Sequence, residues 1–325
     1  MTQRVALCTL AVALSAAALA PEAGHAQAWP TKTVRIIVPF APGGGTDIQA
    51  RVLTASFHEQ TGQSFIIENR TGASGLIGAE IAANAPPDGY TILFSTATLT
   101  INTTLYGSRM KVDPVKDLTP ISWLTSTPLV LVVHPSVPAK SVKELVALAK
   151  KKPAFLNSGI NVPGSTSHLA AEMLKQKAGI EAVIVPYKGG GPAITALMGG
   201  EIDYLFCTGP VAAANLKSGR IRGLAVTTEK KASAFPDLPT MNTFYPGFES
   251  DNWYAMWFPA GTPRDIVAKM NALILKAMQN GKVRQFMESE GLDPVGSTPE
   301  QLAAQIKREI EKYADVIRMA DIKLQ

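Results

Sequence analysis

Short apolar runs of strand length alternate along the chain with segments in which apolar residues recur every three or four positions. Three such runs cover residues 34–40, 64–68 and 90–95, and helical patterns lie between them at residues 47–59 and 72–83. Short apolar runs bounded by turn residues predict strands, and the longer period predicts amphipathic helices. The alternation therefore predicts βαβ units and an α/β fold.

Two strongly apolar runs divide the chain. Leu129–Val133 and Asn252–Phe258 each lead into a proline and then into a helical pattern. The block of about 120 residues between them has its own strand-like runs at residues 154–158, 182–187 and 201–207. We therefore expect two domains, since length alone also predicts about two. The expected boundaries are residues 29–127 together with 252–325 for the first domain and residues 128–251 for the second.

Capping signals mark several helix starts. Ser141 and Glu144 have the spacing of a capping box, and Thr262 precedes Pro263 as an N-cap precedes a first helical residue. A long final helix is expected from Thr298 onward, and its apolar stripe predicts core contact with the first domain. A partner-binding helix is the alternative interpretation. The stripe consists of Leu302, Ile306, Ile310, Tyr313 and Ile317.

The N-terminus has the pattern of a secretory leader. Arg4 is followed by an apolar run from Val5 to Ala20 and then by Ala26-Gln27-Ala28, the small-x-small form of a signal-peptidase site. The apolar run is short for a membrane span. We expect a leader over residues 1–28, cleavage after about Ala28, and a mature chain that begins near Trp29.

Charge and composition exclude several classes of function. The net charge of +5 comes from 31 basic and 26 acidic residues, and the scattered basic residues do not alternate with aromatic ones as in a nucleic-acid face. Without the leader, Cys207 is the only cysteine, and His58, His134 and His168 lack metal-ligand spacing. We expect no disulfide, no metal and no cofactor.

The most informative loop follows the first strand. Residues 38–47 read Val-Pro-Phe-Ala-Pro-Gly-Gly-Gly-Thr-Asp, with three successive glycines before a helix. Glycines leave backbone N–H groups uncovered, and a helix start adds the positive end of its dipole. This arrangement can hold a carboxylate or phosphate without lysine or arginine. Asp47 would repel such an anion, so we expect it to act as the helix N-cap.

Other loops at strand ends are rich in hydroxyl groups. Ser95-Thr96-Ala97-Thr98 follows the third strand, and Ser165-Thr166-Ser167 opens a helix in the second domain. Lys188 and Thr208 stand at two further strand-to-glycine passages. Because ligands of open α/β sheets lie beyond the carboxyl ends of strands, we expect these loops to face one crevice. An ordinary set of polar loops is the structural alternative.

The hydroxyl loops also contain a candidate catalytic pair, a serine nucleophile with a histidine base. Ser165 or Ser167 could in principle pair with His168, and a hydrolase is therefore an alternative interpretation. On the opening turn of a helix, the same histidine is more often a packing residue.

Sequence motifs with the character of one family extend over nearly the whole mature chain. They are Trp29-Pro30, the pattern P-x-x-P-G-G-x-x-D from Pro39 to Asp47, Glu68-Asn69-Arg70-x-Gly72-Ala73, Pro87-Asp88-Gly89-Tyr90, Thr166-Ser167-His168-Leu169, Pro186-Tyr187-Lys188-Gly189 and Pro259-Ala260-Gly261-Thr262-Pro263. In these segments the chain resembles the Bug-type extracytoplasmic substrate-binding proteins of tripartite tricarboxylate transporters.

The resemblance implies a type II, or Venus-flytrap, periplasmic binding protein with two α/β lobes joined by crossing strands and no enzymatic activity. It implies that a small carboxylate lies between the lobes, held by the loop 39–47 and by hydroxyls of residues 165–167, for delivery to the membrane subunits of a transporter. A periplasmic hydrolase on the same scaffold and a ligand sensor for a membrane receptor are the alternatives. We expect a monomer in the periplasm. The candidate ligand-binding residues are Phe40, Ala41, Gly43, Gly44, Gly45, Thr46, Asp47, Ser95, Thr96, Ser165, Thr166, Ser167, Tyr187, Lys188, Cys207, Thr208 and Trp253.

Two departures from the family pattern bear on the ligand. Cys207-Thr208 stands where relatives often have an acidic or small residue, and Trp253, Tyr254 and Trp257 make the returning strand bulkier than usual. No acidic residue clearly faces the expected cleft. We therefore expect a dicarboxylate or an aromatic carboxylate that lacks an amino group.

Overall fold

The computed structural model describes residues 29–229 and 231–319. The expected leader over residues 1–28 and its cleavage position lie outside the described residues. Within them, no helix combines the length and the apolar character that a membrane span requires.

The first of two sheets is mixed and contains six strands in the order β11-β4-β10-β3-β1-β2. Its three N-terminal strands are parallel, and β10 runs antiparallel to both β3 and β4. The strands are β1 (Val34–Val38), β2 (Phe65–Asn69), β3 (Thr91–Thr96), β4 (Leu118–Thr127), β10 (Asn252–Pro259) and β11 (Asp293–Pro294).

The second sheet has five strands in the order β7-β6-β8-β5-β9. Strand β6 is parallel to β7 and β8, whereas β5 is antiparallel to β8 and β9. The strands are β5 (Leu129–Val133), β6 (Asn157–Ile160), β7 (Val183–Pro186), β8 (Tyr204–Thr208) and β9 (Arg222–Val226).

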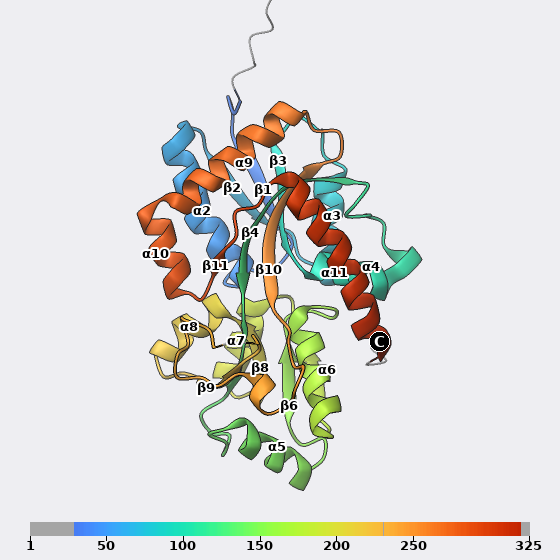
Figure 1. The fold of residues 1–325 in the computed structure, drawn as a ribbon, viewed down its shortest axis with the longest axis vertical. Coiled ribbons are helices and arrows are strands. Elements are labelled where there is room, and N and C mark those ends of the chain that lie inside the picture. Colours follow the sequence, from blue (N-terminus) through green and yellow to red (C-terminus); the bar gives the residue numbers. More distant parts are fainter. Residues whose placement is uncertain (1–28, 230, 320–325) are drawn as a thin grey trace, which may run out of the picture.

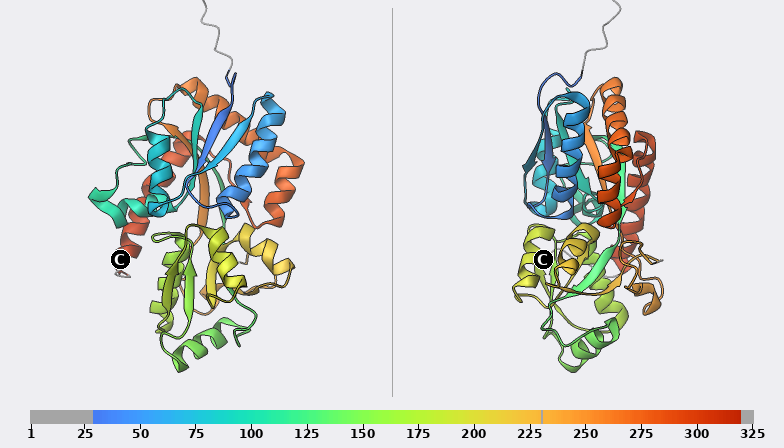
Figure 2. Two further views of the ribbon diagram at one scale, coloured as in Figure 1. Left: turned by 180° about the vertical axis from the view of Figure 1, so that it is seen from behind. Right: turned by 90° about the vertical axis from the view of Figure 1, so that its left-hand side faces the viewer.

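Helices pack around each sheet to form two lobes, which Figures 1 and 2 show one above the other. The first lobe carries α2 (Gly45–Thr61), α3 (Leu76–Ala83), α4 (Thr98–Tyr106), α9 (Arg264–Gln279), α10 (Gly281–Ser289) and α11 (Pro299–Met319). The second lobe carries α5 (Val142–Lys151), α6 (Thr166–Ala178), α7 (Gly190–Met198) and α8 (Gly209–Lys217). Short 3₁₀ turns cover η1 (Ala73–Gly75), η2 (Gly107–Arg109) and η3 (Met241–Thr243).

The chain passes between the lobes along two neighbouring paths. Strand β4 of the first sheet continues through Pro128 into β5 of the second, and the return path enters β10 at Asn252. Since β4 and β10 are paired along their length, both paths lie side by side. Each lobe has apolar clusters of its own, for example around Phe57 in the first lobe and Phe206 in the second. The predicted α/β class is confirmed.

The final helix packs as its apolar stripe predicts. Leu302, Ile306 and Tyr313 are buried in the first lobe in one cluster with Leu118 and Trp257. A reciprocal capping box fixes the start of α11, because Gln301 N–H donates to Thr298 Oγ1 and Thr298 N–H donates to Gln301 Oε1.

Two helix starts differ from the prediction by one or two residues. Helix α9 begins at Arg264 with Pro263 as its cap, while the Thr262 hydroxyl donates to the Pro259 carbonyl. Helix α2 begins at Gly45, so Asp47 lies inside its first turn rather than at the N-cap. In both cases the proline or glycine backbone, and not a capping side chain, sets the boundary.

Candidate functional site

A small cavity of about 30 Å³ lies where the two lobes meet. Loops of the first lobe, loops of the second lobe and the crossing strand β10 all contribute to it. Its fifteen lining residues are Phe40, Gly44, Gly45, Thr46, Thr96, Thr98, Asn161, Val162, Ser165, Thr166, Gly189, Gly190, Thr208, Asn252 and Tyr254.

The start of α2 forms the first-lobe wall of the cavity. Gly44 is its N-cap and makes no side-chain capping bond, so the N–H groups of Gly45 and Thr46 lie in the first turn without an intrahelical acceptor. Gly43 has φ of +78°, a conformation that favours glycine. The loop and the helix dipole thus place N–H donors toward the cavity.

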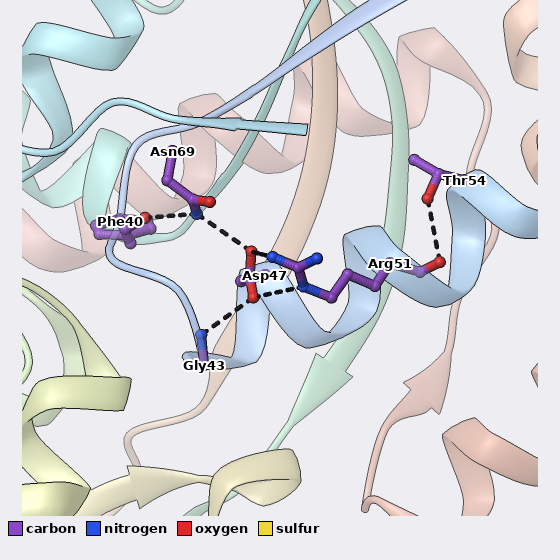
Figure 3. Close-up of polar contacts among 6 residues, drawn as sticks. All are labelled: Phe40, Gly43, Asp47, Arg51, Thr54 and Asn69. Carbon is purple, nitrogen blue, oxygen red and sulfur yellow. Dashed lines mark hydrogen bonds and ion pairs between the residues drawn. The ribbon is translucent and has the colours of Figure 1, made fainter. Parts of the chain in front are cut away.

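Asp47 holds this loop in shape, as Figure 3 shows. Its carboxylate accepts hydrogen bonds from Gly43 N–H (3.0 Å), from Arg51 Nε (2.9 Å) and from Asn69 Nδ2 (3.2 Å). Burial opposes ionisation of Asp47, but these bonds together with the Arg51 charge hold its pKa below the ordinary value. The carboxylate is therefore used to order the glycine loop, and Asp47 does not line the cavity.

Close packing explains the glycine at position 45. A Cβ atom there would lie 2.1 Å from the Tyr254 hydroxyl oxygen and 2.8 Å from Thr208 Oγ1. Because Tyr254 comes from the crossing strand and Thr208 from the second lobe, hydroxyls from two directions converge on the start of α2. Any larger residue at this position would fill the space between them.

Three helix starts of the second lobe face the same cavity. Ser165 caps α6 and accepts from His168 N–H at 3.3 Å, while its own hydroxyl donates to the Val162 carbonyl at 2.7 Å. Gly189 and Gly190 open α7, and Thr208 is the N-cap of α8. As at α2, the first N–H groups of these helices have no intrahelical partner.

The cavity is polar but carries no charge. None of the fifteen described lining residues has an ionised side chain at neutral pH. Burial raises the pKa of Tyr254 to about 12, although Thr208 and Asn252 nearby act in the opposite sense. The phenol is therefore a neutral hydrogen-bond donor. An anion can be stabilised here by helix starts and hydroxyls alone.

Eight of the sequence-predicted residues line the cavity, and the remaining nine do not. Among those nine, Ala41, Gly43 and Tyr187 line a separate outer groove between the lobes. Lys188 contributes its carbonyl, which accepts from Ala41 N–H at 3.1 Å across the lobe boundary. The cavity-lining members are Phe40, Gly44, Gly45, Thr46, Thr96, Ser165, Thr166 and Thr208.

Ser95 and Ser167 are buried beside the cavity. Ser95 lies within β3, paired with Ala255 of the crossing strand. The Ser167 hydroxyl accepts from Asn161 N–H at 2.8 Å and so holds the end of β6 against the start of α6. Both residues support the wall without lining it.

Cys207 and Trp253, both expected among the ligand-binding residues, do not line the cavity and point to the opposite faces of their strands. Cys207 is fully buried in an apolar cluster with Val130 and Leu205, and burial raises its thiol pKa to about 12. Trp253 packs toward α11, where its Nε1 donates to Glu309 Oε2 at 3.1 Å. Side chains alternate along a strand, so their neighbours Thr208 and Tyr254 face the cavity instead.

The serine and histidine of the hydrolase alternative are not paired. His168 Nδ1 accepts from Gly164 N–H at 3.1 Å, and its Nε2 lies 3.8 Å from Glu172 Oε1. Burial lowers the pKa of His168, with Glu172 acting in the opposite sense. Because the Ser165 hydroxyl donates to a carbonyl, the described residues supply no activated nucleophile here.

Sequence reasoning missed several lining residues. Asn252 and Tyr254 follow from the alternation of β10 once its buried face is known, and Thr98 belongs to the hydroxyl loop already singled out. Asn161 and Val162 carry no motif. Their place at the end of β6 is the only signal in the sequence, since loops beyond strand ends face the crevice.

A family model described as the tripartite tricarboxylate transporter family receptor matches residues 49–322. The chain belongs to this family. BugT from Bordetella pertussis is 35% identical over 303 residues, which cover 92% of this chain and 93% of that protein.

Solved structures agree with this assignment. The periplasmic binding protein BugD is 32% identical with a TM-score of 0.88, covering 91% of this chain and 100% of that chain. A protein from R. palustris with adipate has 35% identity and a TM-score of 0.88, covering 91% and 99% of the two chains. MatC from Rhodopseudomonas palustris, with bound malate, has 32% identity and a TM-score of 0.84, covering 89% and 100%.

These similarities confirm the predicted receptor family and the two-lobed binding-protein fold. Proteins of this tripartite tricarboxylate family and the structural neighbours are solute-binding proteins rather than enzymes, and BugD is named as a periplasmic protein.

Proposed function

We propose that the chain is an extracytoplasmic solute-binding protein that captures a small dicarboxylate between its lobes and delivers it to the membrane subunits of a tripartite tricarboxylate-type transporter. The observation that carries this proposal is the uncharged cavity, in which helix starts from both lobes and hydroxyls of Thr46, Thr208 and Tyr254 converge. Neighbours solved with adipate and malate support a carboxylate ligand.

We favour an aliphatic over an aromatic carboxylate, in line with the adipate and malate of the solved neighbours. The aromatic expectation rested on Trp253, Tyr254 and Trp257, and of these only Tyr254 lines the cavity, while Trp253 and Trp257 are buried in a first-lobe cluster that includes residues of α11. The cavity of about 30 Å³ is small beside a dicarboxylate, so binding requires the lobes to move apart at the crossing strands and then to close around the ligand.

We further propose lobe boundaries of residues 29–127 with 252–325 and residues 128–251, a leader cleaved after about Ala28, and a periplasmic monomer. The two crossing paths at Pro128 and at the start of β10 support these boundaries. The family assignment supports export and the transporter partner.

A thermal-shift screen of the mature chain tests the proposal. Aliphatic mono-, di- and tricarboxylates are added at increasing concentration, since a ligand that binds the native state stabilises it by RT ln(1 + [L]/Kd). We expect dicarboxylates to raise the melting temperature in a concentration-dependent way.

Thr208→Val probes the cavity, because it removes a hydroxyl that lines the site and preserves shape. A hydrogen bond to a charged group contributes about 1.5–3 kcal/mol, so the affinity should fall by about 10- to 150-fold. Thr103→Val is the matched control, since Thr103 bonds to the Thr100 carbonyl within α4. Equal shifts in both variants, or none in the native chain, would contradict the proposal.

A further inference from the structure

One side-chain oxygen in the cavity wall has no hydrogen-bond donor. Asn161 Oδ1 is buried and unpartnered within the described part of the chain. The residue itself is firmly held, because its N–H donates to Ser167 Oγ at 2.8 Å and its carbonyl accepts from Gly189 N–H at 2.8 Å. These bonds fix Asn161 between the starts of α6 and α7, at the edge of the cavity.

A buried acceptor without a partner favours a ligand that places a hydrogen-bond donor beside it. An amide oxygen only accepts, and an ionised carboxylate also only accepts, so the two do not form a hydrogen bond. The ligand group next to Asn161 Oδ1 must be a donor, and the common donors of a small carboxylate are a hydroxyl and an ammonium. A desolvated ammonium needs a negative partner, and none of the described lining residues is acidic. The hydroxyl is the donor that fits.

A second buried atom without a partner, the Tyr254 hydroxyl, is placed to donate a hydrogen bond to a carboxylate. The Tyr254 hydroxyl is buried, has no hydrogen-bond partner among the described residues and lies against Gly45 at the start of α2. That position combines a neutral O–H donor with the N–H groups of a helix start, both of which favour an anion. The cavity therefore presents a carboxylate subsite at α2 and an acceptor at Asn161.

We propose that the preferred ligand is a hydroxycarboxylate whose hydroxyl donates to Asn161 Oδ1 while a carboxylate lies at the start of α2 beside Tyr254. This rests on the proposed function and names the ligand class more narrowly. A ligand without the hydroxyl leaves the acceptor buried and unsatisfied, so it should bind about 5- to 150-fold more weakly.

Matched ligand pairs test this with the mature chain in isothermal titration calorimetry. The pairs are malate with succinate and lactate with propionate, which differ by the hydroxyl. We expect the hydroxylated member of each pair to bind more tightly. Asn161→Ala should abolish the preference, because it removes the Oδ1 acceptor, which has no partner among the described residues. Tyr254→Phe should weaken malate and succinate by the same factor and leave their ratio unchanged.

The outcomes separate this inference from the proposed function. Equal affinity of the native chain within both pairs, or a preference that survives in Asn161→Ala, overturns the hydroxyl inference while carboxylate binding stands. Absence of binding by every carboxylate tested overturns both. If Asn161→Ala fails to fold, the ratio measured on the native chain and its persistence in Tyr254→Phe still decide the matter.

Discussion

Substitution of Gly191 by alanine should weaken ligand binding without destabilising the fold. The glycine loop of the first lobe and the Gly189–Gly191 segment of the second contact each other backbone to backbone. A Cβ atom on Gly191 would lie 2.2 Å from the Pro42 carbonyl oxygen and 3.1 Å from the Gly43 carbonyl carbon. To restore ordinary van der Waals separation, the two loops must part by about 1 Å.

The free-energy cost of this substitution falls on the closed arrangement of the lobes. Gly191 lies in the first turn of α7 without a positive φ, so alanine is compatible with its backbone and favours the helix. Overpacking typically costs about 1–3 kcal/mol, and separation also weakens the Ala41–Lys188 hydrogen bond that spans the lobes. If ligand is held only in the closed form, its affinity should fall by about 5- to 150-fold.

The assay combines calorimetric affinity with the radius of gyration from small-angle X-ray scattering. With ligand at a fixed concentration, Gly191→Ala should remain more open than the native chain, while the melting temperature without ligand is unchanged or higher. Gly281→Ala is the control, because Gly281 also opens a helix but nothing lies within 4 Å of its Cβ position. Native affinity in Gly191→Ala would refute the reasoning that this contact defines the closed state.

Two further substitutions test the placement of charged and aromatic groups. Trp253→Phe removes the hydrogen-bond donor to Glu309, whose carboxylate is only 7% exposed. The free energy of unfolding, measured by urea titration, should fall by about 1–3 kcal/mol while carboxylate affinity stays unchanged. Weaker binding at native stability would show that Trp253 contacts ligand instead. A hydrogen bond from Arg35, helped by Arg70 and opposed by burial, lowers the pKa of Glu68 from 4.5 to about 2. Since the folded-state pKa is below the unfolded one, ionised Glu68 stabilises the fold above pH 4.5 and this contribution disappears as the pH falls toward 2. Glu68→Gln should therefore unfold at lower urea than the native chain at pH 7, with a difference that narrows at pH 3; a constant difference would contradict this.

The sequence predicted elements where periodicity was strong and missed those where local preference was ambiguous. Strand β5 has the predicted bounds because Leu129–Val133 is continuously apolar. Strand β4 was not predicted, because Leu118–Thr127 contains a proline and mixes polar with apolar residues. Helix α4 was also missed, since Thr98–Tyr106 is rich in threonine, a weak helix former.

The site shows a similar division. Glycine and hydroxyl loops carry their chemistry in the sequence, so Gly44, Thr46 and Thr208 could be selected from it. The sequence does not show which face of β10 points toward the cavity. Side chains alternate along a strand, so a shift of one residue would place Trp253 in the cavity wall instead of Tyr254. Asn161 reaches the cavity only through the packing of β6 between two helix starts, which no local pattern encodes.

The most direct test of the account is a calorimetric titration of the mature chain with aliphatic dicarboxylates, followed by mass analysis of the ligand recovered from the protein. The account predicts saturable binding of one dicarboxylate per chain and recovery of that ligand unchanged. Absence of binding by any carboxylate would contradict the anion site between the lobes, and recovery of a chemically altered ligand would contradict the function of a binding protein.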